Sequence, residues 1–383
     1  MIAELEIDLG AIRANVRRLA ELVRPARFAA VVKANAYGHG LEPVAQAIGP
    51  EVDAMCVYRT DEATALRGAG ITCPILILGP IEPCDLAFAH QARAAMTMWS
   101  RNGFRRDAAA VARRGGRRFD VHAKIDTGVT RLGLEPDGAA EAIAAYLSDP
   151  DFDLRGVYTH LAAAEELESE FTLAQLAAFR RALAPLDGVL RERRVARHAA
   201  ASAAAILFPA LRLDLVRAGI ATYGIWPSPQ TRAAASEAIE LEPALTWRTN
   251  LVVVREVEAG RSIGYGCTFH TARRSRIGVL PIGYAEGIPR SAGGRAEVLI
   301  AGKRAPIVGR ICMNMAFVDV TDVPLAHAGS SVTLIGADGD ERIDANDLGE
   351  HADTIGYEIV ARLPAEIPRR YLAREAAIVA RTS

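Results

Sequence analysis

The stretch RFAAVVKANAYGHG, residues 27–40, joins a short apolar run to a glycine-rich turn and places Lys33 between the two. A short apolar run is typical of a buried strand, and the Gly-His-Gly that follows it is typical of a turn. The chain has 45 lysines and arginines, of which only Lys33, Lys124 and Lys303 are lysines. A lysine amine can lose its proton and attack a carbonyl group, whereas a guanidinium group stays protonated. We therefore predict a chemical role for Lys33, with an ordinary ion pair at a strand end as the alternative.

Seven further segments repeat this apolar pattern, with amphipathic helical patterns such as 61–70 and 173–183 between them. The seven segments are 54–58, 74–78, 94–98, 118–126, 154–161, 196–202 and 215–224. Apolar strands that alternate with amphipathic helices indicate a parallel sheet. Eight such units in about 200 residues predict an α/β fold that begins with an N-terminal (β/α)8, TIM-type barrel. A doubly wound open sheet is the alternative, but no Gly-rich nucleotide fingerprint follows the first strand.

The composition changes after Gly224. Residues 226–243 contain three prolines and are expected to form a linker. Beyond them, strand-like alternation with Gly-, Asp- and Pro-rich turns predicts a mostly β C-terminal domain. The expected division is therefore a barrel over 1–225, a linker over 226–243 and a mostly β domain over 244–383. The acidic stretch 338–350 lacks the Gly at position six and the Glu at position twelve of a calcium loop, so we expect a solvated loop there.

Charge and cysteine content exclude several classes of function. The net charge of −1 leaves no footprint for nucleic acid or an anionic membrane. No stretch approaches the ~20 apolar residues of a membrane span, and the N-terminus lacks the regions of a signal peptide. The five cysteines show no CxxC spacing, which favours reduced thiols over disulfides or a zinc site. We expect a cytoplasmic protein that has no metal site and binds neither nucleic acid nor membrane.

Candidate site residues gather where the predicted barrel strands end, which is where barrels of this class place their active sites. These residues are Lys33, Lys124, Asp126, Arg131, His160, Ser202, Arg217, Gly219 and Ile220. Turns after the seventh and eighth strands are the usual phosphate site of such barrels. A nucleophilic lysine beside a phosphate site predicts pyridoxal phosphate as the cofactor.

Eight motifs then occur in order along essentially the whole chain. They are VVKANAYGHG (31–40), KIDTGVTRLG (124–133), YTHLA (158–162), VRAGIATYG (216–224), SIGYGCTF (262–269), PIGYAEGIPR (281–290), GRICMNMAFVDV (309–320) and TIGYEIVARL (354–363). This set resembles the alanine racemases, which are pyridoxal phosphate enzymes of fold type III. The resemblance implies racemisation of L-alanine to D-alanine for cell-wall peptidoglycan, by a homodimer with shared active sites.

The resemblance also implies a role for individual residues. Lys33 would hold the cofactor covalently and act as one of two acid–base groups, and Tyr265 of the partner subunit would be the other. Arg131 would bind the substrate carboxylate together with Met313 of the partner subunit. Lys124 is similar to a lysine that is carbamylated in some members of the family and steadies Arg131.

The remaining implied contacts are to the cofactor. The residues that would make them are Tyr37, His160, Ser202, Arg217, Gly219, Ile220 and Tyr357. Arg217 would face the pyridine nitrogen, and His160 would lie between Arg217 and Tyr265. The other five would bind the phosphate. Arg290 resembles a residue at the entrance of the site, and His39 is expected to orient only the local backbone.

The sequence also departs from the family pattern. Asn314 and Glu286 stand where Asp is usual, Thr130 where Gly or Asn is common, and Ala201 where Asn is usual. These changes affect the expected substrate more than the expected reaction. A racemase for serine, or for a broad range of amino acids including basic ones, is therefore the first alternative. Decarboxylation or aldol cleavage on the same barrel, and a non-catalytic pyridoxal phosphate carrier, are further alternatives.

Overall fold

A computed structural model describes residues 3–100, 105–167 and 169–373. Eight parallel strands form one sheet in the N-terminal region, in the order β8-β7-β6-β5-β4-β3-β2-β9. They are β2 (Arg27–Val31), β3 (Ala54–Val57), β4 (Ile75–Ile77), β5 (Ala94–Met98), β6 (Phe119–Lys124), β7 (Phe152–Tyr158), β8 (Ala196–His198) and β9 (Leu215–Ala218). The end strands meet through two hydrogen bonds, from Asp214 N–H to Arg197 O and from Arg217 N–H to Ala200 O, both 3.0 Å. The sheet is thus a nearly closed barrel, and each of the eight predicted segments overlaps one of its strands.

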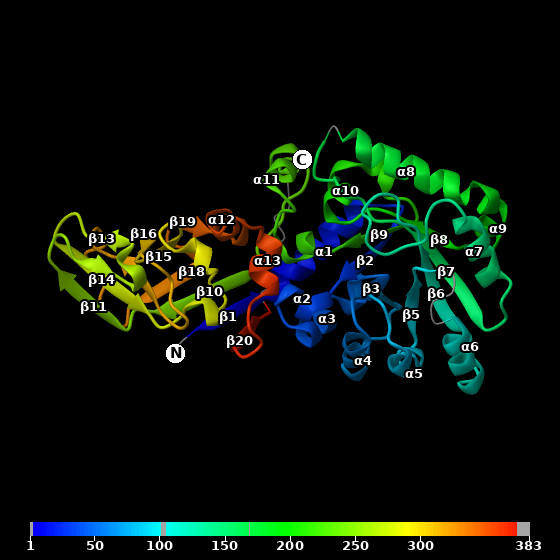
Figure 1. The fold of residues 1–383 in the computed structure, drawn as a ribbon, viewed down its shortest axis with the longest axis horizontal. Helices are drawn as coiled ribbons and strands as arrows, with labels where there is room; N and C mark the ends of the chain where they lie inside the picture. The colour runs from blue at the N-terminus through cyan, green and yellow to red at the C-terminus, as the bar shows by residue number, and fades with distance from the viewer. Residues whose placement is uncertain (1–2, 101–104, 168, 374–383) are drawn as a thin grey trace, which may run out of the picture.

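Helices follow the strands and surround the barrel (Figure 1). They are α3 (Leu41–Ile48), α4 (Thr60–Gly68), α5 (Leu86–Gln91), α6 (Arg105–Arg114), α7 (Ala139–Leu147), α8 (Glu170–Leu183), α9 (Asp187–Glu192) and α10 (Ser202–Leu207). In α8 the buried residues Leu176, Phe179 and Leu183 recur every three or four positions, so one apolar stripe faces the barrel. The side chain of Ser169 caps this helix by accepting a hydrogen bond from Thr172 N–H. The helices predicted at 61–70 and 173–183 are confirmed by α4 and α8.

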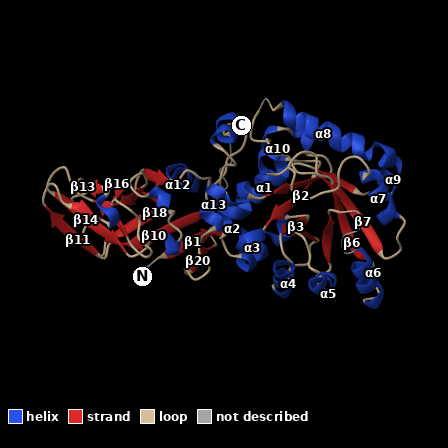
Figure 2. Cartoon of the chain, viewed as in Figure 1, coloured by secondary structure: helices blue, strands red, loops and turns tan. Residues whose placement is uncertain are grey.

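The C-terminal region is mostly strand, as predicted (Figure 2). Its large sheet runs in the order β11-β14-β17-β16-β15-β18-β10-β1-β20, and β19 pairs with β18. These strands are β1 (Glu4–Asp8), β10 (Leu245–Asn250), β11 (Val253–Val257), β14 (Ser275–Leu280), β15 (Glu297–Ile300), β16 (Lys303–Val308), β17 (Ala316–Asp319), β18 (Ser331–Asp338), β19 (Glu341–Ile343) and β20 (Arg369–Leu372). A small hairpin, β12 (Ser262–Ile263) and β13 (Phe269–His270), stands apart from it.

The two regions are joined by segments that are distant in sequence. Strand β1 begins the chain, yet it pairs with β10 and β20 of the second sheet. Helix α1 (Leu9–Leu22) then leads into the barrel, and its buried Asn15 donates to Glu242 O at 2.8 Å and accepts from Glu242 N–H at 2.8 Å. The expected linker contains a helix, α11 (Pro229–Ala235). The structure therefore adds residues 4–8 to the second sheet, and the expected domain boundaries otherwise stay a prediction.

The solvated loop expected at 338–350 is wrong. The segment forms the end of β18, then β19 and helix α12 (Ala345–His351). Asp344 caps α12 by accepting from Asn346 N–H and Asp347 N–H, and Asp347 accepts from Asp344 N–H in return. The acidic residues are thus used to start a helix. In the described part of the chain, none of the helices combines the length and the hydropathy needed to cross a bilayer.

Candidate active site

A cavity of about 960 Å³ opens at the carboxyl ends of the barrel strands. Ten of the residues singled out in the sequence line it: Lys33, Tyr37, Lys124, Arg131, His160, Ser202, Arg217, Gly219, Ile220 and Tyr357. Nine of them lie in the barrel region, and Tyr357 comes from helix α13 (Gly356–Ala361), which lies between the barrel and the second sheet (Figure 1). The fold thus brings these residues together, while their individual roles stay predictions.

Four cations surround the cavity: Lys33, Lys124, Arg131 and Arg217. Burial, followed by the positive charges of the four cations, lowers the pKa of His160 to about 3. Burial and then Arg131 lower the pKa of Lys33, so a larger share of its amine is neutral at a given pH. Glu165, Glu166 and Glu358 also line the cavity, and the four cations favour anionic groups such as a phosphate or a carboxylate beside them.

Lys33 begins a turn of unusual handedness. After β2, the short element α2 (Lys33–Tyr37) has positive φ at four successive residues, Ala34 to Tyr37, with values of 54°, 55°, 53° and 52°. Non-glycine residues rarely adopt this left-handed region, and runs of them are rarer. Strain of this kind clusters at functional sites, where the surrounding structure has to hold it.

Arg217 is held by a buried polar chain inside the barrel. Its guanidinium donates to His198 Nδ1 at 2.6 Å and to the carbonyl oxygens of Thr159 and Ala199 at 2.9 and 3.1 Å. Because Arg217 can only donate, His198 must carry its proton on Nε2 and donate it to His122 Nδ1, 2.9 Å away. A Cβ at Gly156 would lie 2.3 Å from that Nδ1, so only glycine fits there. Three of the five guanidinium N–H donors are thus engaged among the described residues, and the other two remain for a ligand.

The histidine pair His122 and His198 is expected to make the free energy of unfolding depend on pH below neutrality. Burial, followed by Arg217, lowers the pKa of His122 to about 3 and that of His198 well below its usual value. As the pH falls from about 6.5 towards 3, the unfolded chain binds protons that the folded chain does not, so the free energy of unfolding falls. The His122→Gln variant keeps an acceptor for His198 but cannot titrate. We expect its unfolding free energy, measured by urea titration from pH 7.5 to 4, to fall less steeply, by about 1 kcal/mol per pH unit. Identical slopes for the two proteins would contradict the prediction.

The part of the cavity near the carboxyl ends of β8 and β9 has groups suited to bind a phosphate. Ser202 begins α10, and its Oγ accepts from Gly219 N–H at 2.9 Å. A Cβ at Gly219 would lie 2.4 Å from the Tyr37 hydroxyl, so glycine lets that hydroxyl approach. Burial raises the pKa values of Tyr37 and Tyr357, which keeps both hydroxyls protonated. Protonated hydroxyls and helix-start N–H groups are donors suited to phosphate oxygens.

Asp126 positions the loop that carries Arg131. Its Oδ1 accepts from the N–H groups of Gly128, Val129 and Thr130, and its Oδ2 accepts from Arg131 N–H at 2.7 Å. Both oxygens of the Asp126 carboxylate therefore accept hydrogen bonds from backbone N–H groups. Lys124 lies buried nearby, and burial followed by Arg131 lowers its pKa to about 8.

Thr130 is strained in this loop, with φ of 56°. A β-branched residue is costly in the left-handed region, whereas asparagine tolerates it. We expect Thr130→Asn to raise the free energy of unfolding by about 1 kcal/mol, measured by urea denaturation. Thr64→Asn in helix α4, where φ is negative, is the matched control and is expected to give no gain. Equal effects of the two substitutions would show that backbone strain is not the cause.

Tyr265 and Met313 lie away from the barrel cavity. They line a second cavity of about 740 Å³ on the C-terminal region, together with Tyr284, Arg290 and Asn314. Tyr265 is 73% exposed and Met313 is 58% exposed. Within one chain the structure therefore does not bring these two predicted site residues to Lys33.

The two sequence departures near this second cavity form a pair. Asn314 Nδ2 donates to Glu286 Oε1 at 2.7 Å, and Glu286 Oε2 accepts from Gly283 N–H at 2.7 Å. A donor at Asn314 therefore matches the acceptor at Glu286. This pair fastens the loop of Tyr284 to the loop of Met313, where Ala285 N–H also donates to Met313 O.

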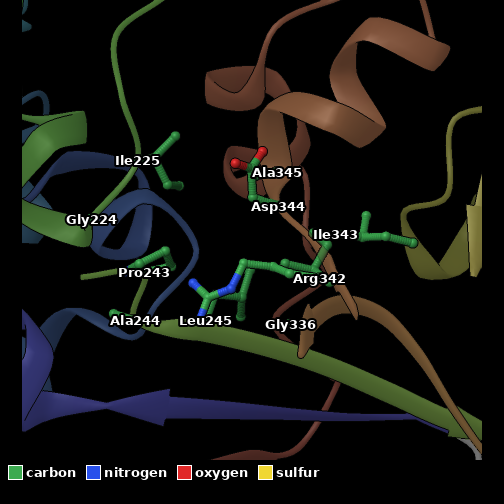
Figure 3. A pocket seen from close by; sticks show the side chains of 11 residues that line it. Gly224, Ile225, Pro243, Ala244, Leu245, Gly336, Arg342, Ile343, Asp344 and Ala345 are labelled. Atoms are coloured by element: carbon green, nitrogen blue, oxygen red, sulfur yellow. The ribbon is translucent and has the colours of Figure 1, made fainter. Parts of the chain in front are cut away.

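A third hollow lies between the end of the barrel region and the strands β18 and β19 (Figure 3). Its volume is about 20 Å³, which admits about one water molecule. It is lined by Ile225, Pro243, Leu245 and Ile343 among others, and Figure 3 shows the apolar side chain of Ile225 directed toward it. It is a packing gap and too small for a substrate.

Sequence reasoning missed three groups that support residues of the active-site cavity. His122 and His198 were visible as polar residues inside predicted apolar strands, which is a signal for an inward-facing network. Glu62 was visible only as an acidic residue near the start of a predicted helix, yet it is buried and accepts from Ala34 N–H at 2.6 Å. Its partner lies 28 positions away, so its role depended on the fold.

A nearly closed parallel barrel with a partly buried amine and a cation-rich cavity at its strand ends defines a barrel enzyme. Residues 7–227 match the family described as the alanine racemase N-terminal domain, and residues 244–371 match the alanine racemase C-terminal domain. The chain is 42% identical over 372 residues to an alanine racemase of Symbiobacterium thermophilum, with 96% of each chain covered. It is 38% identical over 373 residues to one of Desulfovibrio desulfuricans, with 96% of this chain and 97% of the relative covered.

Solved structures of alanine racemases also resemble this chain. Alanine racemase from Clostridium difficile 630 matches with a TM-score of 0.89 at 32% identity, covering 98% of this chain and 97% of that one. Alanine racemase from Bacillus anthracis with bound L-Ala-P matches with a TM-score of 0.87 at 35% identity, covering 98% and 96%. The chain belongs to the alanine racemase family. The resemblance seen in the motifs is confirmed, and the chain is an enzyme of that family.

Proposed function

We propose that the chain interconverts L-alanine and D-alanine with pyridoxal phosphate as cofactor, as a homodimer with shared active sites. One observation supports an active site that is shared between two subunits. Lys33 lines the barrel cavity, whereas Tyr265 and Met313 are exposed on the second region and line a different cavity. An exposed tyrosine and an exposed methionine that line one cavity are suited to burial against another copy of the chain.

The residues around the barrel cavity fit pyridoxal phosphate. Lys33 supplies an amine whose pKa is lowered by burial. Ser202, Gly219, Ile220, Tyr37 and Tyr357 surround the side suited to a phosphate. Arg217 keeps two N–H donors, which suits the pyridine nitrogen as an acceptor. The cofactor, when bound, takes up the electron pair that the α-carbon keeps when its proton leaves.

The chain's own residues would then move the proton. Racemisation removes the α-proton from one face and returns one to the other, so two acid–base groups on opposite faces suffice. We assign these to Lys33 and to Tyr265 of the partner subunit. Arg131, positioned by Asp126, would hold the substrate carboxylate with Met313 of the partner subunit. His160 is neutral because of its lowered pKa, so it would orient its neighbours without adding charge.

The proposed reaction implies a role for its product. D-alanine made here would serve cell-wall peptidoglycan, and the cytoplasmic location expected from the sequence stays a prediction. A racemase for serine, or for a wider range including basic amino acids, remains the second candidate. The basic-substrate form of this candidate is favoured by Glu165, an exposed residue whose carboxylate lines the cavity and suits a positively charged side chain.

The test is exchange of the α-hydrogen in D2O, followed by NMR. The protein with pyridoxal phosphate is incubated separately with L-alanine, L-serine, L-arginine and L-lysine. Loss of the α-proton signal and appearance of the D-isomer for alanine alone would support the proposal. Faster turnover of serine or a basic amino acid would move the assignment to that substrate. No exchange with any of the four would overturn it.

A further inference from the structure

Glu62 is a buried carboxylate between two loops of the active site. Its Oε1 accepts from Ala34 N–H at 2.6 Å, and its Oε2 accepts from Tyr58 N–H and Arg59 N–H at 2.8 and 3.0 Å. The side chain is third in helix α4, which follows β3, whereas Ala34 follows β2. One carboxylate thus joins the loops after two neighbouring barrel strands.

The Ala34 end of this bridge is where the backbone is strained. The left-handed run begins at Ala34, directly after Lys33. Farther along, Asn35 Oδ1 accepts from Leu41 N–H at 2.9 Å, and Gly38 O accepts from the Arg369 guanidinium at 2.9 Å. Among the described contacts, the acceptor that holds the first N–H of the turn is Glu62. Such strain persists only where neighbouring groups fix it.

A carboxylate suits this position and an amide does not. Both oxygens of Glu62 accept, one for Ala34 and one for Tyr58 and Arg59. A glutamine has one acceptor oxygen, so its NH2 group would face an N–H donor on one of the two loops. A buried donor without a partner is costly.

The charge of Glu62 also acts on Lys33. Burial and Arg131 lower the pKa of the Lys33 amine, and Glu62 opposes them by raising it. Glu62 therefore affects both the backbone that carries the amine and the amine's protonation.

We propose that Glu62 is a positioning residue, whose carboxylate fixes the left-handed turn at Ala34 and thereby directs the Lys33 amine into the cavity. This inference rests on the role proposed above for Lys33. The competing explanation is that Glu62 only caps helix α4.

Three variants separate the two explanations. Glu62→Gln removes the charge and one acceptor. Glu62→Asp is one methylene shorter, so it should lose the hydrogen bond from Ala34 N–H. It should keep the helix cap, because Asp347 at the equivalent position of α12 accepts from the N-cap N–H at 2.7 Å. Asp61→Asn is the matched control, since Asp61 is an exposed neighbour on α4 that pairs with Arg59.

The first readout is hydrogen–deuterium exchange of the full chain loaded with pyridoxal phosphate. We expect the segment 33–37 to exchange about tenfold faster in Glu62→Gln and Glu62→Asp, while α4 keeps its protection in Glu62→Asp. The Asp61→Asn protein should match the wild type in this segment. Faster exchange in α4 alone, with 33–37 unchanged, would overturn the proposal in favour of simple capping.

The second readout is competitive acetylation of the cofactor-free chain over a range of pH. Because the chain has only three lysines, mass spectrometry resolves Lys33, with Lys303 as the internal reference. The titration of Lys33 should move to lower pH in Glu62→Gln and stay in place in Asp61→Asn. An unchanged titration of Lys33 in Glu62→Gln would contradict the claim that the charge of Glu62 raises the pKa of Lys33. Neither readout uses turnover, so an inactive wild type would contradict the proposed function without affecting this test.

Discussion

Replacing Lys33 with arginine is expected to abolish racemisation, with a loss of at least about 10³-fold in kcat/KM. The variant keeps the positive charge on the cavity wall, so it changes the chemistry of the group and not the charge. A guanidinium does not give up its proton in proteins and cannot form the covalent bond to pyridoxal phosphate that a lysine amine forms. The structure supports the assignment, because burial and Arg131 lower the pKa of Lys33 and favour the neutral, nucleophilic amine.

The measurement has two parts. Racemisation of L-alanine is followed by chiral chromatography, and covalent attachment of the cofactor is followed by borohydride reduction and mass spectrometry. Lys303→Arg is the matched control, because Lys303 lies exposed on strand β16, outside both cavities. It should behave as the wild type in both assays. A Lys33→Arg protein that still racemises alanine at more than about a tenth of the wild-type rate would refute the role of Lys33 as an acid–base group.

The barrel was predictable from the sequence because its strands are buried on both faces. Such strands appear as short apolar runs, and each predicted run overlaps one observed strand. The ends of those runs then predicted which side chains meet, since the carboxyl ends of parallel strands converge at one rim. Lys33, Arg131, His160 and Arg217 lie around one cavity for that reason.

Contacts that depend on the closed barrel or on the second sheet could not be found in this way. Strand β1 alternates partly exposed Glu6 with buried Leu5 and Ile7, a pattern typical of a strand with one buried face. This strand was not among those expected from the sequence, and its partners β10 and β20 lie some 240 and 364 positions away, so nothing local specifies its sheet. The bond from Glu62 to Ala34 is similar, because nothing in either segment specifies the other.

Mixing two inactive variants is expected to restore activity if the active site is shared between subunits. Lys33→Arg lacks the amine, and Tyr265→Phe lacks the second acid–base group, so each alone should lose at least about 10²-fold. In a dimer of one chain of each kind, one site combines both changes and the other combines neither. Random assembly makes half of the dimers mixed, so an equal mixture should regain about a quarter of the wild-type activity.

The outcome follows from where the structure places the two side chains. Lys33 lines the barrel cavity, and Tyr265 is exposed on the second region of the same chain. If Tyr265 instead served the Lys33 of its own chain, every site in the mixture would carry one change, and activity would not return. Slow exchange of subunits could mimic that result, so the two variants are also co-expressed with different tags and the mixed dimer is isolated. The isolated mixed dimer should then show about half of the wild-type activity; an inactive one would mean that the site lies within one chain and that the Tyr265 region must move to reach it.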